Sequence, residues 1–241
     1  MELSDFELER IAFEFRYAPA YLHFDRAGAL WTEATERWPN LKPERSEPTV
    51  TTFHLDNHHE FSVTIDKTHV VSHYPNVEEF VQLCEPFTEL VTRNLGVLYF
   101  SRIGLRHVYF RKFPSKEEAS AAVLSTRMLS IPEGHATPPS NERRHFGVEL
   151  SSLYPEYALR ADGQGTGFVL RLRSEVRKID FDPPMNMRQI NALHETKAGI
   201  LFDIDYYTTA KVSIGQFRAQ EWLNQAIHLV RRDSRQFLGG P

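Results

Sequence analysis

The stretch "SRIGLRHVYFRKFP", residues 101–114, decides the fold, because apolar and cationic residues alternate along it as they do in a half-buried strand. One face of this strand carries Ile103, Leu105, His107 and Tyr109, and the other carries Arg102, Gly104, Arg106 and Val108. A strand with one apolar face and one charged face is typical of an antiparallel sheet that helices cover on a single side.

The arginines of this strand have two interpretations. Arg102 and Arg106 flank Gly104, which permits close approach by a ligand, so the pair could hold a phosphate or a carboxylate. The alternative is that both arginines form ion pairs with acidic residues of neighbouring strands, as structural arginines often do. The sequence favours the second interpretation.

The segments on either side of this strand alternate between strands and helices. Residues 11–17 have the period of a strand, residues 50–75 read as a β-hairpin, and residues 76–95 form an amphipathic helix between Asn76 and Gly96. Residues 166–173 and 199–207 again have strand periodicity, and residues 214–237 have a helical apolar face. We therefore expect an α+β fold with antiparallel β-sheets and helices on one face.

Each half of the chain contains a hairpin followed by a long helix. The predicted organisation is an α+β half over residues 1–129, a proline-containing linker over residues 130–144, and a β-rich half over residues 145–241 that ends in the long helix.

Composition excludes several classes of protein. The 241 residues are 41% hydrophobic and 25% charged, with a net charge of −4, so nothing global draws the chain to nucleic acid or to a membrane. Cys84 is the single cysteine, which rules out an intrachain disulfide, and its place on an apolar helical face predicts an inert thiol. The sequence predicts a cytoplasmic protein without a cofactor or a membrane segment.

The segment "HLDNHHE", residues 54–60, is the best candidate for a metal site. On an extended chain His54, Asp56 and His58 share one side, and imidazole with carboxylate suits zinc or iron. The alternative, which the sequence favours, is a polar hairpin turn at Asp56 that needs no metal.

Asp203 and Asp205 in "FDIDY" share a strand face, as the carboxylate pair of a two-metal enzyme does. Arg171 and Arg173 are expected on a neighbouring strand, facing the same way. Cross-strand ion pairs explain all four charges without catalysis, so the sequence favours a structural role. If the face binds a ligand, Arg171 and Arg173 are expected to bind it together with the arginines of 101–114.

Residues 101–114 resemble the mid-chain motif of a sporadically distributed family of uncharacterised bacterial proteins of about 250 residues, in which an Arg-x-Gly-x-Arg strand leads to a proline. The order of elements is also similar, with an early "EFRY" strand, a helix that ends at Trp-Pro and a C-terminal amphipathic helix. His107 departs from the family pattern. The resemblance implies a bacterial cytoplasmic protein, emphasises Arg102, Gly104 and Arg106, and brings no activity with it.

We therefore expect a non-enzymatic protein that binds another protein or itself, with a role in bacterial defence or toxin neutralisation implied by the resemblance. The first alternative is a metal- or phosphate-dependent enzyme that uses Asp203 and Asp205 or the His54 group. The second is a nucleic-acid-binding protein, which the acidic net charge disfavours.

Overall fold

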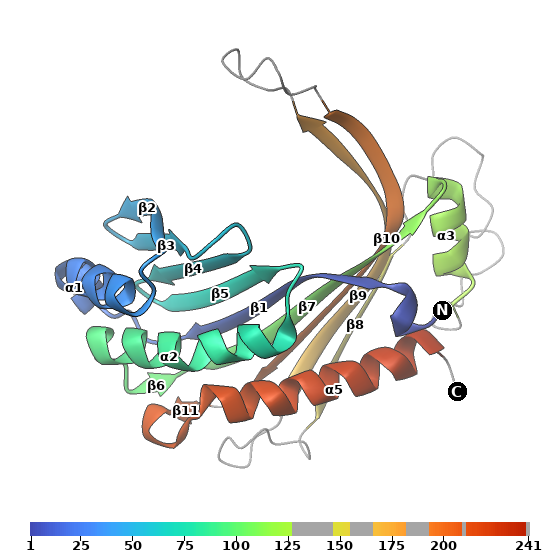
Figure 1. The fold of residues 1–241 in the computed structure, drawn as a ribbon. Coiled ribbons are helices and arrows are strands. Elements are labelled where there is room, and N and C mark those ends of the chain that lie inside the picture. Colours follow the sequence, from blue (N-terminus) through green and yellow to red (C-terminus); the bar gives the residue numbers. More distant parts are fainter. Residues whose placement is uncertain (127–146, 155–165, 182–192, 209–210, 240–241) are drawn as a thin grey trace.

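A nine-stranded antiparallel sheet dominates the computed structural model, which describes residues 1–126, 147–154, 166–181, 193–208 and 211–239 (Figure 1). The strands stand in the order β2-β3-β4-β5-β1-β7-β10-β9-β8. Their bounds are β1 Glu7–Arg16, β2 Lys42–Glu47, β3 Val50–His54, β4 His59–Thr64, β5 Lys67–His73, β7 Arg102–Phe113, β8 Gly147–Tyr154, β9 Thr166–Phe181 and β10 Leu193–Thr208. This arrangement confirms the predicted α+β class.

The strand β7, which contains most of residues 101–114, lies near the middle of the sheet. It pairs with β1 on one side and with β10 on the other, both antiparallel. The same sheet therefore contains strands from both halves of the sequence. The predicted linker at 130–144 lies outside the described residues, and the division into halves stays a prediction.

Helices cover one face of the sheet. Helix α2 (Val77–Leu95) and helix α5 (Ala219–Gly239) run along this face, while α1 (Leu22–Arg37) packs on α2 and α3 (Lys116–Leu124) packs against β9 and β10 (Figure 1). A minor two-stranded sheet joins β6 (Tyr99–Phe100) to β11 (Val212–Ser213). None of the helices in the described ranges has the length and apolar character needed to cross a membrane.

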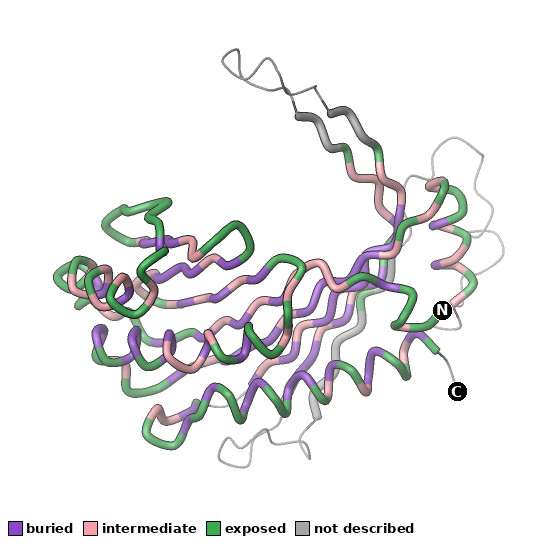
Figure 2. The backbone as a smooth tube through the Cα atoms, viewed as in Figure 1, coloured by how far each residue is buried: buried purple, intermediate pink, exposed green. Residues whose placement is uncertain are grey.

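The core lies between the sheet and these helices, where the buried residues of both layers meet (Figure 2). Along β7 the buried side chains on this face are Ile103, Leu105, His107 and Tyr109, so the predicted alternation is confirmed. Burying a large apolar side chain stabilises the fold by about 1.5–3 kcal/mol. Cys84 is fully buried in this core, as its place on an apolar helical face predicts, and burial raises the pKa of its thiol well above the usual value.

Helix α2 begins and ends where the sequence predicts. The Asn76 side chain accepts hydrogen bonds from the backbone N–H groups of Glu78 and Glu79, and Gly96 ends the helix in a left-handed conformation with φ of 62°. Pro86 lies inside the helix without dividing it.

The segment 50–75 differs from the predicted hairpin, because it forms three strands, β3, β4 and β5. The turn between β4 and β5 is held by Thr64, whose hydroxyl donates to Asp66 and accepts from the backbone N–H of Lys67. A fourth strand, β2, was not predicted at all. Its residues "KPERSE" are all exposed, so no apolar alternation marks it in the sequence.

Candidate functional site

The face of the sheet turned away from α2 and α5, called here the open face, carries rows of charged side chains. One row of directly opposite residues runs from Glu149 on β8 through Arg171 on β9 to Asp203 on β10, and Asp203 then contacts Arg106 diagonally on β7, where its direct partner is Val108. Arg171 Nε lies 2.6 Å from Glu149 Oε2, and Arg171 Nη1 lies 3.4 Å from Asp203 Oδ2. Cross-strand neighbours of opposite charge thus join the strands on this face.

Asp203 is the centre of this row. Its side chain is only 1% exposed, and Arg106 donates to both of its oxygens, from Nε and Nη2 at 2.7 Å each. This two-point contact matches the planar fork of a guanidinium to a carboxylate. Hydrogen bonding to Asp203 raises the pKa of Arg106 further, so Arg106 stays charged at any relevant pH.

Arg102 lies flat over the open face because Gly104 has no side chain. A Cβ at Gly104 would stand 2.5 Å from Arg102 Nη1. The guanidinium donates to Glu14 Oε1 at 3.1 Å and to Asp205 Oδ2 at 2.6 Å, and it stacks on the Tyr207 ring at 4.9 Å. Gly104 therefore gives room to a side chain of the protein itself.

These contacts bear on the predicted two-metal pair. Arginines occupy the positions beside Asp203 and Asp205 in which divalent ions would bind. Arg106 forms a two-point ion pair with Asp203, and Arg102 forms an ion pair with Asp205. Burial raises the pKa of Asp205, although the nearby Arg102 opposes this shift. A buried carboxyl that protonates more readily is a weaker ligand for a metal ion. The geometry thus favours the structural interpretation of this pair.

Beside these ion pairs the open face has a hollow of about 380 Å³, called here the arginine hollow. Its lining residues are Glu9, Arg10, His73, Tyr74, Arg106, Val108, Arg173, Glu175, Arg177 and Leu201. Four arginines and two glutamates leave two positive charges in excess, with histidine counted as neutral. Such a lining attracts an anion.

Two of the four arginines have hydrogen-bonding capacity to spare. Arg106 is held by Asp203, and Arg177 by Glu9 and Glu175, with its guanidinium 4.0 Å from the centre of the Phe110 ring. Arg173, whose side chain is 54% exposed, has one long contact among the described residues, to Glu175 at 3.4 Å. Arg10 forms no ion pair with any described residue.

A bulge in β1 shapes one wall of the hollow. The register of β1 against β7 shifts between Leu8 and Arg10, so Glu9 is an extra residue in the ladder. As a result Leu8 packs on the core while the consecutive residues Glu9 and Arg10 both line the hollow. Bulges commonly redirect side chains near functional sites.

Tyr74 forms the rim of the hollow in a strained conformation. Its φ is 48°, the one positive value among the described residues other than glycine, and its side chain is 62% exposed. The backbone N–H of Tyr74 donates to the Glu9 carbonyl at 2.7 Å, which holds this conformation in place. Backbone strain of this kind is concentrated at binding and catalytic sites.

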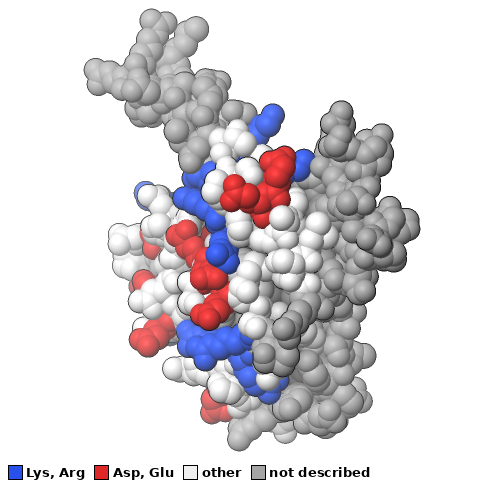
Figure 3. All heavy atoms as spheres, turned by 90° about the vertical axis from the view of Figure 1, so that its right-hand side faces the viewer, with Lys and Arg blue, Asp and Glu red and all other residues white. Residues whose placement is uncertain are grey.

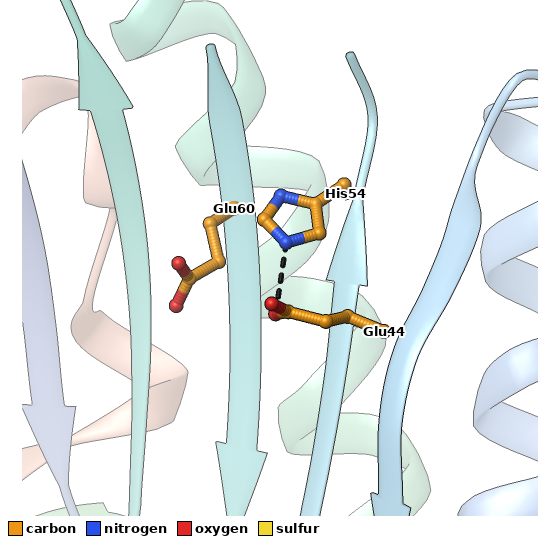
Figure 4. A group of neighbouring side chains, drawn as sticks. All are labelled: Glu44, His54 and Glu60. Atoms are coloured by element: carbon orange, nitrogen blue, oxygen red, sulfur yellow. Dashed lines mark ion pairs between the residues drawn. The ribbon is translucent and has the colours of Figure 1, made fainter. Parts of the chain in front are cut away.

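The predicted metal residues do not come together. Asp56 accepts hydrogen bonds from the backbone N–H groups of His58 and His59 and contacts the His59 ring at 2.9 Å, so it organises the turn. His54 points instead toward Glu44 and Glu60 (Figure 4), and its Nε2 lies 2.8 Å from Glu44 Oε2. His54 is thus the one member of the predicted set that has a metal-like neighbourhood.

Sequence reasoning missed Arg10 and Arg177 of the arginine hollow and Glu44 beside His54. Arg10 lies just before the predicted strand of residues 11–17, and the bulge that turns it into the hollow leaves no mark in the pattern of residues. Glu44 lies on β2, for which no strand was expected.

Comparison with known proteins gave no match, either to a protein-family model or to a curated protein.

Proposed function

We propose that this chain is a binding protein that holds an acidic segment of a partner protein in the arginine hollow. The observation that carries the proposal is the pair Arg10 and Arg173, two guanidinium groups that keep free donors in a hollow of net positive charge. Arginine is the side chain best suited to carboxylate recognition, because its donors match both oxygens. A toxin neutralised by binding in the bacterial cytoplasm, as the family resemblance suggests, is one such partner.

Two features support binding over catalysis. The carboxylates nearest to the hollow, those of Asp203, Glu9 and Glu175, each contact arginine and serve to fix its position. Arg106 and Arg177, which are held in this way, give the hollow a fixed wall and lose little side-chain entropy on binding, while Arg10 and Arg173 supply the donors. In addition, the strained Tyr74 offers an exposed aromatic ring beside the charges, as anchors of protein interfaces commonly do.

Nucleic acid receives less support as the partner. On the side of the molecule presented in Figure 3, acidic side chains lie among the basic ones. A phosphate backbone is bound along an extended path by basic groups that neutralise successive phosphates, and this mixed surface offers no such continuous path.

Calorimetric titration with a hexaglutamate peptide tests the proposal. We expect binding that weakens as salt rises, and a loss of at least tenfold in affinity for the double variant Arg10→Gln, Arg173→Gln. Arg16→Gln is the matched control, since Arg16 lies on the same strand but outside the hollow. Undetectable peptide binding, or an equal loss for the control, would contradict the proposal. Stronger binding of a single-stranded oligonucleotide of equal charge would favour nucleic acid instead.

An apolar surface at the other end of the sheet favours self-association as a second candidate. The apolar end consists of Tyr21, Leu22, Phe24, Leu98 and Tyr99, which are between 42% and 71% exposed. It adjoins a hollow of about 470 Å³ that Leu98 and Tyr99 help to line. Exposed apolar groups gathered in this way are typical of protein interfaces.

Sedimentation velocity over a range of protein concentrations tests this second candidate. We expect a dimer that Leu98→Glu converts to monomer, while Thr32→Glu, on the exposed side of α1, leaves it intact. A wild-type chain that stays monomeric at all concentrations would exclude self-association through the apolar end.

A further inference from the structure

Glu44, His54 and Glu60 stand on three adjacent strands, β2, β3 and β4, and lie beside one another on the open face, with the His54 ring directed toward Glu44 (Figure 4). His54 and Glu60 are direct cross-strand partners, and the ligand atoms of all three residues lie within 4.8 Å of one another. We propose that these three side chains form a binding site for a divalent transition-metal ion of the zinc class.

The chemistry of the three donors fits such an ion. An imidazole nitrogen and two carboxylate oxygens bind zinc at about 2.0–2.2 Å, and three protein ligands leave a fourth position for water. The side chains are 55%, 35% and 30% exposed for Glu44, His54 and Glu60, so an ion reaches them without opening the fold. Small rotamer changes bring the donors from their present spacing to tetrahedral distances.

The charges around the group also favour a cation. Elsewhere on the open face the carboxylates contact arginines, but Glu44 and Glu60 form their ion pairs only with histidines among the described residues. Lys42 stands opposite His54 in the ladder and Arg45 follows Glu44 in the chain, but neither forms an ion pair with Glu44 or Glu60 among the described residues. A bound divalent ion compensates the two carboxylates directly.

His69 on β5 contacts Glu60 and does not itself belong to the three proposed ligands. Its Nε2 lies 3.3 Å from Glu60 Oε1, within hydrogen-bonding distance. Hydrogen bonds of this kind keep a ligating carboxylate ionised and oriented. We assign His69 as a positioning residue for Glu60, while His54, Glu44 and Glu60 bind the ion directly.

The experiment is titration of the chelator-treated, full-length protein with Zn²⁺, read by calorimetry and repeated with Co²⁺, whose visible absorption reports tetrahedral coordination. We expect one ion per chain at micromolar affinity or tighter, a loss of at least tenfold for His54→Gln and for Glu44→Gln, and a smaller loss for His69→Gln. His58→Gln is the matched control, because His58 is exposed in the adjoining turn and belongs to the set that the sequence suggested.

Three outcomes would overturn the proposal: no ion bound at one per chain, equal losses for His54→Gln and His58→Gln, or a Co²⁺ spectrum of octahedral type that the variants leave unchanged. The denaturant midpoint of unfolding is measured for each variant without bound ion. A midpoint equal to that of the wild type shows that the variant is folded, so that a loss of Zn²⁺ or Co²⁺ binding reflects the site. The hexaglutamate titration uses other residues, so failure of either experiment leaves the other interpretable.

Discussion

The two faces of β7 differ in whether a titratable side chain is charged, although the residues of the two faces alternate along one strand. On the open face Arg106 is fixed in its charged form by the two-point contact with Asp203. On the core face its sequence neighbour His107 is 1% exposed and remains neutral, because burial, and to a lesser degree the nearby Arg231, lower its pKa to about 3. Partners on other strands and helices, and not the local sequence, decide whether a charge is kept.

Removing an ion pair of the open face is expected to give the largest change in stability among the tests of this comparison. Asp203→Ala removes the buried carboxylate that Arg106 and Arg171 share, and leaves two like charges side by side. We expect a loss of about 3 kcal/mol in the free energy of unfolding, measured in urea.

Asp205→Asn is the matched control for that variant. Arg102 keeps a second acceptor in Glu14 when Asp205 is neutralised, so we expect a loss below about 1 kcal/mol. Equal losses for the two variants would mean that the two-point contact of Arg106 has no special weight.

A second test replaces two glycines of the open face, Gly199 and Gly104, by alanine, because side chains of the same face lie directly over them. A Cβ at Gly199 would stand 2.2 Å from the Phe110 ring and 2.5 Å from the backbone oxygen of Arg111. We expect Gly199→Ala to destabilise the protein by about 2 kcal/mol, measured by thermal and urea unfolding, because backbone atoms cannot move aside.

Gly104→Ala provides the comparison for Gly199→Ala. The nearest atoms there belong to the mobile end of Arg102, which can shift at a cost below about 1 kcal/mol. If Gly104→Ala proved the more damaging of the two, the position of Arg102 would matter more to the fold than its contacts indicate.

Much of this architecture could be predicted from the sequence. The alternation of 101–114 placed Leu105 in the core and Arg106 outside, and Asn76 and Gly96 marked the ends of α2, because these features depend on local geometry. Ion pairs between neighbouring strands were expected for Arg106 and for Asp203, but their pairing with each other was not, because it depends on the order of the strands. Asp203 and Arg171 were expected to face the same way, because neighbouring strands compensate each other's charges.

The rest depends on contacts between distant segments. The order of strands in the sheet brings Glu9 of β1 to Arg177 of β9, 168 residues later in the chain. The bulge at Glu9 and the exposed strand with Glu44 have no apolar period to reveal them. The sites proposed here lie at these two features, which is why sequence periodicity could not locate them.

The smallest effect concerns the neutral state of His107, and it separates the two faces by their response to pH. The folded pKa of about 3 lies below the ordinary histidine pKa of 6.5, so between these values the unfolded chain binds a proton that the folded chain does not. Stability is therefore lost as pH falls through this window. Lowering the pH from 6 to 5 should cost about 1.2 kcal/mol through this residue alone.

The variant His107→Phe isolates this contribution, since it keeps a ring in the core but cannot titrate. In this variant the Tyr109 hydroxyl, which lies 2.9 Å from His107 Nδ1 in the wild type, loses its partner at every pH. The lost hydrogen bond therefore lowers the free energy of unfolding by the same amount at each pH and does not change its dependence on pH. We expect urea unfolding of the variant to have a shallower dependence on pH than the wild type between pH 6 and 5, while His228→Gln, at an exposed position of α5, keeps the wild-type slope. Parallel curves for wild type and His107→Phe would mean that His107 accepts a proton inside the fold, and the contrast between the two faces of β7 would then be lost.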